Sequence, residues 1–153
     1  SVVYRLQKSP ELHLDYGNLR ASLPGDDISI ADVRKAVIEI RRSKLPEPDE
    51  YGSAGSFFMN PVIPTEQYEK LKSSYPDVVD DMHVKVPAGW LIDRCGWKGK
   101  SFGGAAVYEK QCLVLINKNN AKPNDVVALA EMIRKSVSDT YGIVINPEVN
   151  YIE

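Results

Sequence analysis

The first part of the chain shows two different spacings of hydrophobic residues. Hydrophobic and polar residues alternate over residues 3–7 and again over residues 12–16. This alternation predicts two strands, most simply a hairpin around the short connection between them. From Ser29 onward apolar residues recur every three or four positions, which predicts a helix ending near Arg42, with Ser29 as its N-cap and Asp32 completing the cap.

The remainder of the chain predicts three more helices and five short strands. The helices are expected over residues 66–74 with Thr65 as N-cap, from Pro87 or Ala88 to Gly96, and from Pro123 to Gly142. The strands are expected over residues 83–86, 105–108, 112–117, 143–146 and 148–152. Strands and helices follow no repeated strand–helix–strand order. We therefore expect an α+β fold in which a mostly antiparallel sheet packs against about four helices.

Residues 52–61, Gly-Ser-Ala-Gly-Ser-Phe-Phe-Met-Asn-Pro, combine backbone freedom, polar side chains and an apolar anchor. The two glycines permit a positive φ and close approach of the backbone to a ligand, whereas Phe57 and Phe58 must be buried. Ser56 is therefore expected at an element boundary, with its hydroxyl facing a cleft. The ordinary alternative is a glycine-rich turn that enters a strand and binds nothing.

Composition and charge limit the classes of function. The 153 residues have an ordinary composition, with 19 basic and 21 acidic residues mixed along the chain and a net charge of −2, which disfavours nonspecific nucleic-acid binding. The basic segment 97–104 is a weak candidate for a phosphate contact, because it lacks the spacing of a P-loop. Cys95 and Cys112 are too few for a disulfide framework, and no cysteine or histidine cluster has the spacing of metal ligands, so no metal is expected.

Neither a signal peptide nor an apolar run of about 20 residues occurs, so we expect a cytoplasmic chain that does not enter a membrane. The chain begins at Ser1 directly in a strand-like pattern and without a methionine, which indicates a piece of a longer protein. Within that protein, residues 1–153 are expected to form a single domain.

Six separated stretches of the chain form one recognisable combination. In order they are Arg41-x-x-Lys44-Leu45-Pro46, Gly52-x-Ala54-Gly55-Ser56-Phe57-Phe58-x-Asn60-Pro61, Ala88-Gly89-Trp90-Leu91-Ile92-Asp93, Gly103-Gly104-Ala105-Ala106-Val107, Leu113-Val114-Leu115-Ile116-Asn117 and Pro147-Glu148-Val149. Together they resemble, in order and spacing, the C-terminal domain of UDP-N-acetylenolpyruvoylglucosamine reductase, the MurB flavoenzyme family of bacterial peptidoglycan precursor synthesis.

The resemblance implies an oxidoreductase, a UDP-N-acetylmuramate dehydrogenase. In this family a hydride passes from NADPH to FAD and then to the enolpyruvyl group of UDP-N-acetylglucosamine enolpyruvate. FAD is bound mainly by an N-terminal portion that this sequence lacks, so no cofactor-binding residue is expected here. The resemblance therefore implies a substrate-binding domain that works with a flavin-binding domain in cis and is inactive alone.

Three residues are assigned to catalysis by the resemblance. Ser56 matches the serine that donates a proton to the substrate carbon. A serine hydroxyl is a weak acid, so a nearby cation is needed to stabilise the alkoxide or relay its proton, and Lys44 matches a family lysine placed there. Glu148 matches a C-terminal glutamate that polarises the enol or assists as an acid, and for that role we expect it to be buried beside Pro147 and Tyr151.

Substrate binding is assigned by the resemblance to four residues, Arg41, Asn60, Lys98 and Gln111. Without the resemblance, cations near the end of a helix, such as Arg41 and Lys44, simply complement the helix dipole. Two positions depart from the family pattern and change its local charge. Met59 stands where the family usually has lysine, and Asn150 stands where it often has arginine.

A rival interpretation comes from another class of protein: a non-catalytic α+β ligand-binding or interaction module that kept the scaffold and lost the chemistry. A flavin-binding domain encoded upstream would distinguish the enzyme from this module. The enzyme interpretation also makes a geometric prediction. Ser56, the end of the helix near Lys44 and the last strand, which carries Glu148, should converge on one edge of the sheet in an open cleft.

Overall fold

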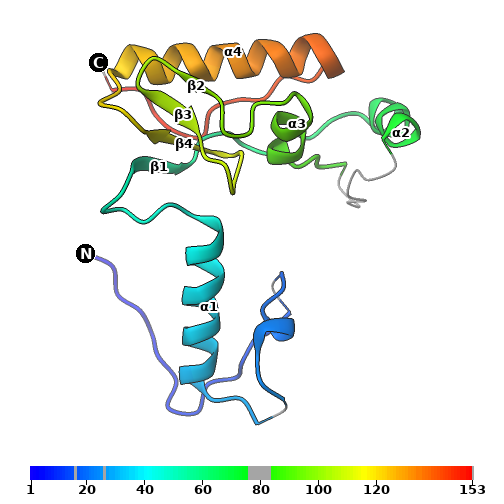
Figure 1. Cartoon of the computed structure of the whole chain (residues 1–153). Coiled ribbons are helices and arrows are strands. Elements are labelled where there is room, and N and C mark those ends of the chain that lie inside the picture. The colour runs from blue at the N-terminus through cyan, green and yellow to red at the C-terminus, as the bar shows by residue number, and fades with distance from the viewer. Residues whose placement is uncertain (16, 26, 76–83, 153) are drawn as a thin grey trace. The chain divides into compact units, whose positions relative to one another are not determined.

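The computed structural model of the chain describes residues 1–15, 17–25, 27–75 and 84–152. The chain forms two compact units, Ser1–Lys44 and Leu45–Glu153 (Figure 1). Each unit has hydrophobic clusters of its own.

The smaller unit is built on helix α1 (Ile30–Lys44), which runs slightly further than predicted. The predicted cap is confirmed: the Ser29 N–H donates to Oδ2 of Asp32 at 3.0 Å, and the Asp32 N–H donates to Oγ of Ser29 at 3.2 Å. Hydrogen bonds from the Ser29 hydroxyl and then from its N–H hold the pKa of the Asp32 carboxyl below its usual value. A short 3₁₀ helix, η1 (Arg20–Ser22), precedes α1.

The hairpin predicted at the start of the chain is wrong. None of residues 1–15 lies in a strand, and residue 16 is outside the described part of the chain. The hydrophobic side chains of Val2, Val3 and Leu6 are exposed. A two-stranded ribbon is only marginally stable unless a third strand or a helix covers its apolar face. Nothing within the described part of this unit covers these side chains, which explains why the alternating pattern does not become a hairpin.

Within its described residues, the larger unit contains a four-stranded antiparallel sheet with the order β1-β4-β3-β2. The strands are β1 (Gly52–Ser56), β2 (Ser101–Phe102), β3 (Ala105–Val107) and β4 (Val114–Asn117). The glycine-rich stretch is therefore an edge strand rather than a turn. Its register shifts between Ser53 and Ser56, and Gly55, with φ of +77°, provides the backbone freedom for that irregularity.

Three helices occur in the described part of the larger unit: α2 (Thr65–Ser74), α3 (Ala88–Arg94) and α4 (Pro123–Tyr141). α4 contacts β2, β3 and α3 (Figure 1). Its predicted end is confirmed, because Gly142 adopts the left-handed conformation that terminates a helix. The predicted cap of α2 is wrong: Thr65 lies inside the helix, and Pro64 occupies the N-cap position. The antiparallel sheet and the helices confirm the predicted α+β fold.

Three predicted strands are wrong in the residues that the structure describes, those over 83–86, 143–146 and 148–152. Residue 83 lies outside the described ranges. The other residues of these segments form only one isolated bridge, Lys85 with Val62. Pro147, between the last two segments, forms another with Phe58. Pro147 has no N–H to donate, so it interrupts a ladder that its neighbours could otherwise extend.

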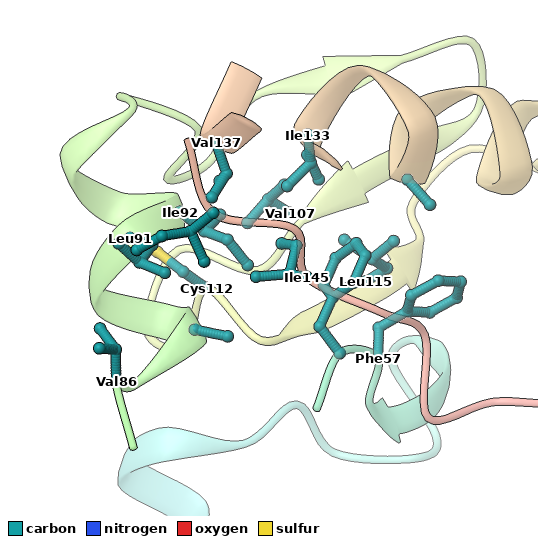
Figure 2. Packing of buried hydrophobic residues seen from close by; sticks show 14 of the residues in the cluster. Phe57, Val86, Leu91, Ile92, Val107, Cys112, Leu115, Ile133, Val137 and Ile145 are labelled. Carbon is teal, nitrogen blue, oxygen red and sulfur yellow. The ribbon is translucent and has the colours of Figure 1, made fainter. Parts of the chain in front are cut away.

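The two faces of the sheet bury different side chains, because successive residues of a strand point to opposite sides. One face belongs to the main core, which Figure 2 shows through Phe57, Val86, Leu91, Ile92, Val107, Cys112, Leu115, Ile133, Val137 and Ile145. We call the opposite side the second face; its buried residues are Ala106, Tyr108, Val114 and Ile116, with Leu45 and Tyr51 packed beside them.

Gly104 occupies a position where a side chain would collide with the backbone. A Cβ atom on Gly104 would lie 2.5 Å from the N and Cα atoms of Ala121 and 2.5 Å from the carbonyl oxygen of Asn119. Backbone atoms cannot swing aside as a flexible side chain can. We therefore predict that Gly104→Ala lowers the free energy of unfolding, measured in urea, by about 2 to 3 kcal/mol.

Gly52→Ala is the control for this prediction. A Cβ atom on Gly52 would meet only the Cβ atom of Asn117, at 3.8 Å, which is an ordinary contact distance. The expected change in the free energy of unfolding is below about 0.5 kcal/mol. Similar losses in the two variants would contradict the backbone collision at Gly104.

Cys112 allows a pH test of the main core. Its side chain is 5% exposed, and this burial, followed by the negative charge of Asp93, raises the pKa of the thiol from 9.0 to about 11. Between those pH values the folded chain binds more protons at this thiol than the unfolded chain does. The contribution of Cys112 to stability is therefore lost as the pH rises from about 9 to about 11.

We predict that Cys112→Ala removes this part of the alkaline loss of stability. Between pH 8 and pH 11, the gap in unfolding free energy between the original chain and the variant should narrow by about 2 kcal/mol. Urea denaturation at a series of pH values measures the gap. Val107→Ala, which truncates another buried side chain but has no proton to lose, should keep a constant gap. A constant gap for Cys112→Ala as well would show that the thiol does not titrate as described.

Candidate functional site

Ser56 and Glu148 lie on neighbouring backbone segments at one edge of the sheet. Ser56 ends the edge strand β1. Phe57 follows Ser56 directly, and its carbonyl accepts a hydrogen bond from the N–H of Glu148 at 2.9 Å. The N–H of Met59 donates to the carbonyl of Asn146, also at 2.9 Å. These two bonds bring segments that are about 90 residues apart in the sequence side by side.

Two buried phenylalanines fix the backbone directly after Ser56. Phe57 and Phe58 are 3% and 1% exposed, and their rings meet edge to face with centroids 5.1 Å apart. The N–H of Phe57 also donates to the carbonyl of Leu113 at 2.7 Å, just before β4. The expected burial of both phenylalanines is confirmed. Ser56 is exposed beside this anchor.

The Ser56 side chain belongs to the second face of the sheet. Ser56 is paired with Val114 in the register of β1 and β4, and the side chains of directly opposed residues lie on the same face. Val114 is part of the second-face cluster. A ligand would therefore reach the exposed hydroxyl from the side of the sheet away from the main core.

Glu148 is exposed, which corrects the expectation that it is buried beside Pro147 and Tyr151. The segment runs along the edge of the sheet, where its backbone is paired but no other described element covers the Glu148 side chain. The Tyr151 ring instead lies 6.4 Å from the ring of Phe57 and stays half exposed. The Glu148 carboxylate is consequently accessible to solvent and is not covered by any of the described residues.

Asn60 and Gln111 both contribute hydrogen bonds to the fold close to α3. Oδ1 of Asn60 accepts a hydrogen bond from the N–H of Ala88, the first residue of α3, at 2.9 Å. Oε1 of Gln111 accepts one from the N–H of Leu113 at 3.3 Å. The same oxygen lies 3.2 Å from the place that a Cβ atom on Gly89 would occupy. Asn60 and Gln111, which were predicted to bind substrate, therefore also stabilise the local backbone.

These hydrogen bonds fix the orientation of the two amides. A backbone N–H can donate to the oxygen of a side-chain amide but not to its NH2 group, so the oxygens of Asn60 and Gln111 accept these bonds. A side-chain amide has two N–H donors in addition to its oxygen. Those donors suit a ligand rich in acceptors, such as the oxygens of a phosphate.

Lys98 lies close to the last turn of α3, where its Nζ is 3.8 Å from a carboxylate oxygen of Asp93. Both side chains are about half exposed, so solvent weakens this pair. Lys98 belongs to the basic segment 97–104, which contains the short strand β2. Within that segment the Nζ of Lys100 lies 5.4 Å from the centroid of the Trp97 ring. Asn60, Gln111 and Lys98 are thus gathered around one short helix.

Arg41 and Lys44 lie in the last turn of α1 and are exposed. There, cations interact favourably with the carbonyl end of the helix dipole, so their position has a local explanation. Both residues belong to the smaller unit and Ser56 to the larger one. The convergence of this helix end with Ser56 stays a prediction.

The second face also carries a hollow of about 220 Å³, which was not predicted from the sequence. Its polar lining includes Tyr51, Tyr108, Lys110 and Lys118. Tyr108 directly follows the alternating residues of β3, so the period of the strand was the available signal for its place on this face. The sequence gives no comparable signal for the two lysines.

Within the described ranges, no group of three or more His, Cys, Asp or Glu side chains could hold a metal ion. In the same part of the chain, no helix has the length and apolar character needed to cross a membrane.

Comparison with known proteins identifies the family. Residues 47–152 match the family described as UDP-N-acetylenolpyruvoylglucosamine reductase, C-terminal domain. Proteins of that name from Bacteroides fragilis, Flavobacterium johnsoniae and Paraburkholderia xenovorans are 49%, 42% and 45% identical to the chain. The alignments cover 99%, 99% and 97% of this chain but 47%, 48% and 45% of those relatives, so the chain spans about half their length. The chain belongs to the UDP-N-acetylenolpyruvoylglucosamine reductase family and corresponds to its C-terminal domain.

Proposed function

We propose that the chain is the substrate-binding and proton-donating domain of a UDP-N-acetylmuramate dehydrogenase, which converts UDP-N-acetylglucosamine enolpyruvate to UDP-N-acetylmuramate in the cytoplasm. The observation that carries the proposal is the exposed Ser56, beside the segment that bears Glu148, in a domain of this family. The other half of the enzyme, a flavin-binding domain in cis, would lie in the length of the relatives that this chain does not span.

In the proposed reaction FAD, reduced by NADPH, supplies the hydride that adds to the enolpyruvyl methylene. No residue of this chain is assigned to hold FAD. The residues assigned in this chain would act on the substrate and its proton.

Ser56 would deliver that proton. Addition of a hydride to the methylene leaves negative charge on the adjacent carbon and its carboxylate, and this carbon must then be protonated. Ser56 offers an exposed hydroxyl on a backbone fixed by buried phenylalanines. Loss of its proton leaves an alkoxide, which the positive charge of Lys44 would stabilise in the proposed enzyme. Glu148 would polarise the enol or assist as an acid, and substrate binding would supply the burial that it lacks here.

The remaining assigned residues would bind the anionic parts of the substrate. Asn60 and Gln111 can direct amide N–H donors toward phosphate oxygens, because their own oxygens already accept backbone hydrogen bonds. Lys98 adds a positive charge close to the same helix, α3. Arg41, an exposed guanidinium, suits paired hydrogen bonds to a phosphate or carboxylate.

Ser56→Ala tests the proton donor in the proposed full-length enzyme. Reduction of FAD by NADPH should stay nearly unchanged, because Ser56 acts only on the second substrate. Reoxidation by the enolpyruvyl substrate should slow by about 10²- to 10⁴-fold. Rapid-mixing absorbance of the flavin follows both half-reactions separately.

Ser53→Ala is the control, since Ser53 is also an exposed hydroxyl on β1 and is paired with a second-face residue, Ile116. It should leave both half-reactions within about twofold of the unchanged enzyme, as expected for a surface substitution away from the chemistry. An equal loss in both half-reactions for Ser56→Ala would point to a structural role. A full-length protein without either half-reaction would favour the non-catalytic module instead.

Asn60 allows folding and substrate binding to be tested separately. Asn60→Asp keeps an oxygen for the Ala88 N–H but replaces the two N–H donors by a second acceptor. The free energy of unfolding should change little, while KM for the enolpyruvyl substrate should rise about 10- to 100-fold. Asn60→Ala, which removes the oxygen as well, should also lower the free energy of unfolding by about 1 to 2 kcal/mol. An unchanged KM in both variants would remove Asn60 from the binding site.

A further inference from the structure

One side chain of α4 holds the segment that bears Glu148 from its inner side. Nε of Arg134 donates a hydrogen bond to the carbonyl oxygen of Ile145 at 3.0 Å. Ile145 is fully buried in the main core, three residues before Glu148. Water cannot readily replace a bond in that position, so its loss would leave a backbone carbonyl poorly satisfied.

Arg134 is in turn held by Glu131, one turn earlier on α4. NH1 of Arg134 donates to both carboxylate oxygens of Glu131, at 2.7 and 2.9 Å. The Arg134 side chain is only 30% exposed. The planar guanidinium carries five donors in a fixed geometry, so it can bind a carbonyl and a carboxylate at once. A lysine has a single ammonium group and cannot reproduce that arrangement.

The same pair of charges also affects the ionisation of Tyr151, near the far end of the segment. The pKa of the Tyr151 hydroxyl is raised by burial and then by the charge of Glu131, and the charge of Arg134 lowers it in part. Both charges therefore act on Tyr151, three residues after Glu148. Arg134 thus binds one end of the stretch that carries Glu148, at Ile145. The charges of Arg134 and Glu131 act on its other end, at Tyr151.

We propose that Arg134 is a positioning residue that sets the place of Glu148 relative to Ser56, an inference that rests on the function proposed above. On one side the segment is held by its backbone bonds to the residues after Ser56. These bonds flank one isolated bridge, between Phe58 and Pro147, and do not form a continuous strand pairing. Arg134 holds the other side, so the two contacts together limit how far Glu148 can shift. A displacement of about 1 Å at a reacting group can cost roughly 10²-fold in rate.

The test is a double-mutant cycle in the proposed full-length enzyme. Arg134→Gln should slow reoxidation of the flavin by the enolpyruvyl substrate by about 10²-fold and leave its reduction by NADPH unchanged. In a Glu148→Gln background the same substitution should have little further effect, because the group that Arg134 positions has lost its function. Arg134→Lys should recover only part of the rate.

Two controls separate positioning from general loss of stability. Lys135→Gln changes the next residue of α4, an exposed cation paired with Asp139, and should leave reoxidation unchanged. Val137→Ala removes buried side-chain atoms from the same helix and should lower the thermal unfolding temperature without slowing reoxidation, when rates are measured well below that temperature.

The outcomes are distinct. If Glu148→Gln slows reoxidation but Arg134→Gln does not, or if the two effects multiply in the double variant, Arg134 does not position Glu148 and this inference is overturned alone. If Val137→Ala slows reoxidation as much as Arg134→Gln, the effect is one of stability and the inference is again overturned. If Glu148→Gln leaves reoxidation unchanged, the proposed role of Glu148 fails as well.

Discussion

The arrangement of the candidate site depends on the burial of two consecutive aromatic side chains. In a regular strand Phe57 and Phe58 would point to opposite faces, yet both are almost completely buried. The chain leaves the sheet at this point. Phe57 still bonds to Leu113 through its N–H, while its carbonyl already accepts the N–H of Glu148. Phe57 therefore bonds both to the sheet and to the C-terminal segment. Ser56, directly before it, stays exposed where the two meet.

The two faces of the sheet contribute unequally to stability. Its inner face packs with α4, whose Leu129, Ile133 and Val137 are fully buried. Ser56 lies on the second face, where the buried cluster is much smaller. Substitution of an exposed residue there removes little buried area, so the main core can persist while the surface of the second face varies.

Local signals predicted the helices well and the strands poorly. The Ser29 and Asp32 cap and the glycine after α4 act over three or four residues, so the sequence alone contains them. A strand needs a partner, and that partner is often far away in the chain. Residues 3–7 alternate correctly but find no covering layer in their unit, whereas Gly52–Ser56 has a poor strand composition and still pairs with β4. Strand formation here is decided by tertiary context rather than by propensity.

The site shows the same limit at the level of single side chains. The residue types around the proposed substrate were evident from the sequence, but the exposure of Glu148 and the engagement of Asn60 were not. Both depend on what the neighbouring backbone does. The Ala88 N–H takes the oxygen of Asn60, and this single bond leaves the amide donors as the part that can meet a ligand. In the proposed site, a side chain that supports α3 would thereby turn its N–H donors toward an acceptor-rich substrate, so the orientation of the amide is set by the fold.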